Sequence, residues 1–171
     1  MTTTERITIW LLFATAFTLP MYMRVNNLIL GGFLVAACVL ALQNGTFRNL
    51  GKGLYLGLPV VAFFGLALFG AFRDFSLENF KYLEKYWSLL LLPMVMLALP
   101  GFYARHKPAI FKALLWGCIT TLLICYGAAI WEMISGSEPL SYFFRWRHLG
   151  HQFTDVADTH PTYLAVFIVM A

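Results

Sequence analysis

The sequence predicts an all-α, polytopic transmembrane helix bundle with about five complete spans, a truncated sixth span and an interfacial amphipathic helix. Hydrophobic residues make up 60% of the 171 residues and charged residues 12%, whereas soluble domains carry about 25% charged residues. Apolar runs recur along the whole chain, and a run that lies in lipid must satisfy its own backbone hydrogen bonds. The runs are too long and too uniformly apolar for the alternating strands of a membrane barrel, so we expect helices.

Two apolar helices are expected near the N-terminus, at about 7–23 and 28–42. The first follows Arg6 as a signal peptide would, but no clear small-residue cleavage site precedes the next run, so it is interpreted as a retained signal anchor. Pro20 lies near its end and is expected to kink or stop it. A very short turn that contains Arg24 separates the two runs. We therefore expect a tight helical hairpin.

Two more spans are expected in the middle of the chain, at about 54–72 and 87–99, and Pro93 lies inside the second. The segment 77–86 between them mixes acidic, basic and aromatic side chains. Aromatic side chains of this kind favour the headgroup level of a bilayer. The segment is therefore predicted to be an amphipathic helix that lies in the interface or lines a wet cavity.

The C-terminal part is expected to contain a short basic loop at 101–108, a fifth span at about 109–134 and a long polar loop at 135–159. Pro161 then opens a last apolar helix, because proline suits the first helical position, and His160 is expected at its N-cap. About ten residues follow, where a membrane crossing needs about 20. We therefore expect 1–171 to be a single transmembrane domain and an N-terminal fragment of a longer membrane protein.

The distribution of Lys and Arg does not orient this bundle by itself, because the two sides carry equal numbers. The basic residues of 77–86 belong to the amphipathic segment and not to a free loop, which favours a cytoplasmic N-terminus. The loop 135–159 and His160 would then lie on the outer face. The net charge of +4 reflects Lys and Arg at helix ends near anionic lipid, and no nucleic-acid partner is inferred from it.

The three cysteines lie inside apolar runs, where a free thiol packs as a small hydrophobic group. They are Cys38, Cys118 and Cys125. Their positions do not match the ligand spacing of a zinc site, so no metal and no cofactor are expected.

Two stretches resemble a known family. Residues 83–93 read LEKYWSLLLLP, and residues 160–165 read HPTYLA. In this order they resemble the bacterial O-antigen ligase and O-antigen polymerase family. The first stretch departs from the family pattern at Tyr86, where a basic residue is expected, and at Trp87.

The resemblance implies a metal-independent glycosyltransferase of the bacterial inner membrane. Such an enzyme moves a glycan from an undecaprenyl pyrophosphate carrier to the lipid A core or to another surface glycan. The implied partners are the carrier-linked donor, the lipid or glycan acceptor and the membrane lipids. The resemblance does not separate ligase from polymerase, and a fragment of this kind is expected to be inactive alone.

Transfer from a pyrophosphate carrier needs cations at the leaving group and a base near neutral pKa at the acceptor hydroxyl. Arg145 and Arg147 suit the first role and His160 suits the second. Tyr163 in the matched motif and Lys85 complete the expected substrate-binding set. Plainer interpretations are open as well, since the arginines and Lys85 are also typical of headgroup anchors, and His160 is also a plausible helix cap.

Two other classes of function remain open from the sequence. The proline-interrupted runs at Pro20 and Pro93 are also typical of the discontinuous helices of transporters. The chain could then belong to a transporter or flippase for a lipid-linked or anionic solute. A small structural membrane subunit is the third interpretation.

Overall fold

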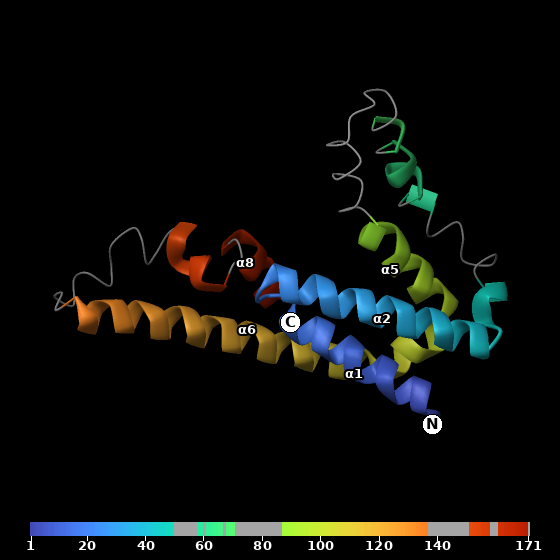
Figure 1. Ribbon diagram of the computed structural model, residues 1–171, viewed down its shortest axis with the longest axis horizontal. Helices are drawn as coiled ribbons and strands as arrows, with labels where there is room; N and C mark the ends of the chain where they lie inside the picture. Colours follow the sequence, from blue (N-terminus) through green and yellow to red (C-terminus); the bar gives the residue numbers. More distant parts are fainter. Residues whose placement is uncertain are drawn as a thin grey trace. The chain divides into compact units, whose positions relative to one another are not determined.

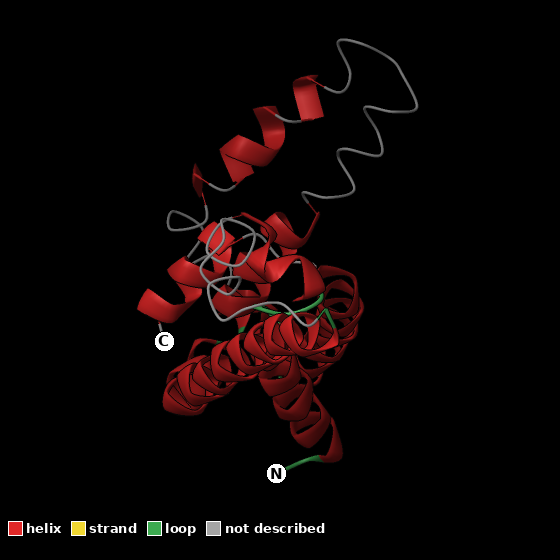
Figure 2. Cartoon of the chain, turned by 90° about the vertical axis from the view of Figure 1, so that its left-hand side faces the viewer, coloured by secondary structure: helices red, strands yellow, loops and turns green. Residues whose placement is uncertain are grey.

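A computed structural model of the chain describes residues 1–49, 58–59, 61–66, 68–70, 87–136, 151–157 and 161–170. This described part is helical apart from a few connecting residues, and it contains no strand (Figure 2). Its elements are α1 (Thr3–Thr18), α2 (Met23–Gln43), η1 (Thr46–Asn49), α5 (Trp87–Ala98), α6 (Pro100–Ser135), η3 (His151–Ala157) and α8 (Pro161–Met170) (Figure 1).

The prediction of about five complete spans is wrong. Among the described residues, two helices are long and apolar enough to cross a membrane, Arg24–Gln43 within α2 and the whole of α6. Helices α1 and α5 have 16 and 12 residues, or roughly 24 and 18 Å at 1.5 Å per residue. A hydrocarbon core is about 30 Å thick, so the described residues of each helix are too few to cross it.

Proline residues follow closely after the C-terminal ends of both helices. Pro20 lies in the turn that follows α1. Helix α5 ends at Ala98, Leu99 connects it to α6, and Pro100 is the first residue of α6. Helix α8, at the place of the expected sixth span, has ten residues (Pro161–Met170). The expected third span at 54–72 lies only partly within the described residues, and the amphipathic segment 77–86 lies outside them.

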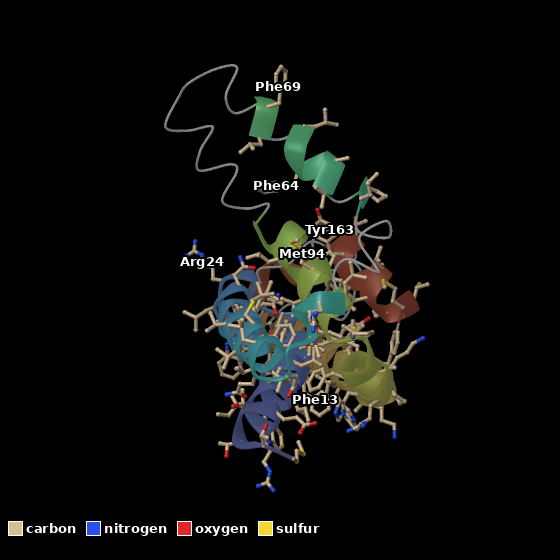
Figure 3. The ribbon with its side chains drawn as sticks, turned by 90° about the vertical axis from the view of Figure 1, so that its right-hand side faces the viewer. Phe13, Arg24, Phe64, Phe69, Met94 and Tyr163 are labelled. Atoms are coloured by element: carbon tan, nitrogen blue, oxygen red, sulfur yellow. The ribbon has the colours of Figure 1, made fainter. Side chains whose placement is uncertain are left out.

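The two long helices expose most of their apolar surface. Only 28% of the apolar window of α2 and 33% of that of α6 is buried, whereas the core helix of a soluble protein would be mostly buried. Leu28 and Trp131 are 80% and 72% exposed. Arg24 at the start of the α2 span points away from the ribbon (Figure 3). Extended apolar surface of this kind is typical of contact with lipid or with a partner, which fits a membrane protein.

Local hydrogen bonds move the ends of the first two helices from their expected positions. Helix α1 begins at Thr3 and not near Ile7, because the Thr2 hydroxyl accepts a hydrogen bond from the Glu5 N–H at 3.2 Å and caps the helix. Helix α2 already includes the residues expected as a turn and has 21 residues. It ends before Gly45, whose φ of 62° is the left-handed conformation common at helix ends.

The loop expected at 101–108 is helical, so that prediction is also wrong. Helix α6 runs without a break for 36 residues from Pro100 and contains Pro108. A proline inside a helix removes one backbone hydrogen bond, but it does not end α6. No charged side chain lies between Lys112 and Glu132, a distance of roughly 28 Å along the helix. The length of this uncharged stretch is close to the thickness of a hydrocarbon core.

The chain divides into two compact units. Unit 1 comprises Met1–Ile9 and Leu30–His106, and unit 2 comprises Trp10–Ile29 and Lys107–Ala171. In unit 1, α5 packs against η1, and Val95 and Ala98 of α5 are buried. Phe33 of α2 is fully buried in the same unit.

Unit 2 contains a close contact between α1 and α6. A Cβ atom on Gly117 would overlap with the carbonyl oxygen of Phe17 and lie 3.0 Å from Cγ of Pro20. One turn further along α6, the buried Thr121 hydroxyl lies 2.8 Å from the Gly117 carbonyl oxygen and 3.3 Å from that of Pro20. A small residue therefore brings the two backbones together, and a hydroxyl group satisfies the carbonyl in the turn.

Candidate functional site

The expected site residues lie mostly outside the described part of the chain. This applies to His160, Arg145, Arg147 and Lys85. Tyr163 is described and lies on α8. Helix α8 begins at Pro161, and this start agrees with the expected one.

Helix α8 is held against α6 within unit 2. Leu164 is 3% exposed and packs with Leu114 and Cys118 of α6. Leu122 and Phe167 extend this apolar contact. Because the contact is made by the first turns of α8, it fixes the N-terminal part of the helix that carries the matched motif.

Tyr163, which is labelled in Figure 3, precedes Leu164. Its side chain is 54% exposed. Successive residues of a helix are about 100° apart around its axis. The aromatic ring is therefore displaced from the buried face that Leu164 marks. A phenol on an exposed helix face can donate and accept a hydrogen bond and can stack against a sugar ring.

Element η3 lies on the other side of the undescribed residues 158–160. Its Phe153 ring meets the Tyr126 ring of α6 edge-on, with centroids 4.9 Å apart and ring planes at 62°. Thr154 and Ala157 are buried, and η3 also contacts α8. Element η3 therefore contacts both α6 and α8, and α8 packs on α6 as well.

Helix α6 also carries two cysteines and one acidic residue within or near its apolar stretch. Cys118 and Cys125 are both 1% exposed in the apolar part of the helix, which fits packing. Glu132 is half-buried near the helix end, and its backbone carbonyl accepts hydrogen bonds from Gly136 N–H at 2.9 Å and Ser135 Oγ at 3.3 Å. Its position suits the interface more than the bilayer centre.

Sequence reasoning missed a pocket of about 280 Å³ in unit 1. It lies between the start of α1, the end of α2 and the region where α5 passes into α6. Its lining combines polar and apolar side chains. The lining residues are Glu5, Leu40, Asn44, Thr46, Ala98, Leu99, Pro100, Gly101, Phe102 and Arg105.

Residues at two helix junctions line the pocket. The Asn44 N–H bonds to the Leu40 carbonyl at 3.0 Å, and Gly45 turns the chain so that Thr46 follows beside the helix end. Between α5 and α6, the N–H groups of Phe102 and Tyr103 bond to the Leu99 carbonyl at 3.1 and 3.2 Å. The Asn-Gly pair was a visible turn signal in the sequence. Nothing local, however, showed that this turn, residue 5 and residue 105 would line one pocket.

The chain matches no protein-family model, no curated protein and no solved structure.

Proposed function

We propose that this chain takes part in the transfer of a glycan from an undecaprenyl pyrophosphate carrier to the lipid A core or to another surface glycan, as in the O-antigen ligases that it resembles. The observation that carries the proposal is the arrangement of α8. The helix that bears the matched motif begins at Pro161, is fixed on α6 through Leu164, and leaves Tyr163 exposed. A transfer site needs substrate-binding groups on a rigid support.

The membrane character of the chain supports the same proposal. Helices α2 and α6 are long enough to cross a bilayer. A polyprenyl carrier keeps its chain in the hydrocarbon and its pyrophosphate at the headgroup level. An enzyme that acts on such a carrier must place its cations and its base at that level, next to apolar helices.

In the proposed reaction the acceptor hydroxyl attacks the anomeric carbon of the donor sugar. His160 takes the hydroxyl proton as the new glycosidic bond forms. The bond between the anomeric carbon and the pyrophosphate oxygen breaks, and the carrier leaves with both electrons as an anion. Arg145, Arg147 and Lys85 stabilise that negative charge, and Tyr163 hydrogen-bonds to the sugar.

The proposal is tested with the protein as its gene encodes it, in bacterial membranes that hold a carrier-linked glycan and an acceptor. We expect His160→Ala to reduce glycan transfer by about 100-fold or more, as the loss of a general base does, and Tyr163→Phe to reduce it less. Val169→Ala is the matched control, because Val169 lies on α8 and is 87% exposed. Membrane levels of all variants are compared by immunoblot.

Unchanged transfer by His160→Ala at equal membrane levels would reduce this residue to a helix cap. Absence of transfer by the unmutated protein would contradict the proposal as a whole. Transport is then the next assay, because the buried Pro20 interrupts the chain between α1 and α2 and interrupted helices are common in transporters.

A further inference from the structure

The pocket of unit 1 contains two opposite charges that no described side chain neutralises. Glu5 is half-buried and Arg105 is exposed, and both line the pocket. In a capping box, a Glu at the third position of a helix turns back to the N-cap residue. Here Thr2 caps α1 through the Glu5 N–H, and Glu5 is one of the residues that line the pocket.

The pocket lies where a membrane span ends. The α2 span ends at Gln43, and the polar lining residues Asn44 and Thr46 follow directly. Leu40 lies one turn before that end and contributes to the apolar part of the lining. Residues that directly follow a membrane span lie at the headgroup level of a bilayer, which is the level expected for this pocket.

We propose that this pocket binds the headgroup of a phosphatidylethanolamine-type lipid, with the phosphate on Arg105 and the ammonium group on Glu5. A guanidinium group donates charge-assisted hydrogen bonds to phosphate oxygens, and a carboxylate accepts them from a primary ammonium group. The inference is independent of the proposed glycan transfer, since it concerns different residues.

The remaining lining residues fit the rest of such a lipid. The Thr46 hydroxyl donates to the Ala41 carbonyl at 3.3 Å, so its oxygen can still accept a hydrogen bond from the ammonium group. Leu40, Leu99 and Phe102 offer apolar contacts to the glycerol and the first acyl carbons. The pocket volume of about 280 Å³ is slightly below the range of ligand pockets, about 300–1,000 Å³, and suits a headgroup better than a whole lipid.

The charge pair also distinguishes this lipid from its neighbours in a membrane. A phosphatidylglycerol headgroup brings a negative charge to Arg105 but no cation to Glu5. A phosphatidylcholine headgroup brings a cation, but its methylated nitrogen has no proton to donate to the carboxylate. Only a primary amine joined to a phosphate satisfies both side chains at once.

The test is native mass spectrometry of the full chain in detergent, mixed with equal amounts of phosphatidylethanolamine, phosphatidylglycerol and phosphatidylcholine. The measurement is the amount of each lipid that stays bound when the detergent is removed. We expect the unmodified chain to prefer phosphatidylethanolamine by about tenfold, the usual effect of a charge-assisted hydrogen bond. Glu5→Gln should remove the preference over phosphatidylglycerol. Arg105→Gln should weaken the binding of phosphatidylethanolamine and of phosphatidylglycerol about tenfold. Arg105→Lys should retain the binding of both lipids.

Arg6→Gln is the matched control, because Arg6 is exposed on the first turns of α1 and does not line the pocket. Its lipid preference should equal that of the unmodified chain, and circular dichroism should show equal helix content in all variants. Equal retention of the three lipids by the unmodified chain would overturn the proposal, as would a preference that survives Glu5→Gln. If free phosphoethanolamine displaces bound phosphatidylethanolamine as effectively as added phosphatidylethanolamine does, the assignment to a lipid is overturned.

Discussion

Gly117 of α6 lies directly against the carbonyl group of Phe17 in α1, and no side chain fits between the two backbones. Close approach of this kind lets two helices gain van der Waals contact without a hydrophobic driving force, which is the usual way in which helices associate in lipid. The contact joins segments 100 residues apart in the sequence. It therefore makes unit 2 sensitive to changes at this one glycine.

We expect Gly117→Ala to destabilise the protein by about 1–3 kcal/mol, the usual cost of overpacking, because backbone atoms would have to move. Thermal unfolding in detergent, followed by circular dichroism, measures the effect. Gly127→Ala is the control, since an added Cβ there meets nothing within 4 Å and alanine favours a helix over glycine by up to about 1 kcal/mol. If both variants unfold alike, the contact with Phe17 is absent.

Thr121→Val should also weaken the contact between α1 and α6. Valine has nearly the same shape but removes the hydroxyl group that lies 3.3 Å from the Pro20 carbonyl oxygen, at a position that is fully buried. The expected loss is about 1 kcal/mol. Thr120→Val is the matched control, because the Thr120 hydroxyl donates a hydrogen bond within its own helix, to the Trp116 carbonyl. Equal effects of the two substitutions would contradict a specific role for Thr121.

Leu164→Ala should release α8 from α6. The side chain is 3% exposed and packs with Leu114 and Cys118, and a Leu-to-Ala change at a buried site costs about 2–5 kcal/mol. The effect should be local, so hydrogen exchange of the α8 amides is the measurement, with faster exchange expected in 161–170. Val169→Ala removes a similar amount of side chain from an exposed position and should leave exchange unchanged.

If α2 and α6 both cross a membrane, we expect Asn44 and Arg105 on one side of it and Ser135 on the other. Asn44 and Arg105 line the same pocket, whereas Ser135 is at the other end of α6. In a background without native cysteines, Arg48→Cys and Arg105→Cys should react with a membrane-impermeant maleimide from the same side, and Ser135→Cys from the opposite side. Labelling of all three from one side would exclude a membrane-spanning α6.

Local signals in the sequence were sufficient to locate several helix ends. Pro161 begins α8 as expected, because a proline after a polar run has few other places in a helix. Helix α5 ends at Ala98, one residue before the expected end, since Pro100 follows closely. In each case the residues that decide the boundary are neighbours in the chain.

The same kind of signal misled where helix continuity or distant contacts decide. The basic residues of 101–108 indicated a loop, but charged residues are good helix formers and Pro108 removes only one hydrogen bond. The number of spans was overestimated because apolar runs were counted without the stops that cut α1 and α5 short. The pocket escaped detection because its residues come from three separate segments, and no periodic pattern connects Glu5 with Arg105.

The uncharged stretch of α6 also determines which membranes suit the protein. Lys112 and Glu132 bound a length of roughly 28 Å between two charged groups of opposite sign. In a thinner bilayer the helix can tilt until its apolar length matches the hydrocarbon. In a thicker bilayer it cannot stretch, so the lipid around it must thin, at a cost of a fraction of a kcal/mol per Å of mismatch. That cost would sort the protein toward the thinner regions of a membrane that varies in thickness.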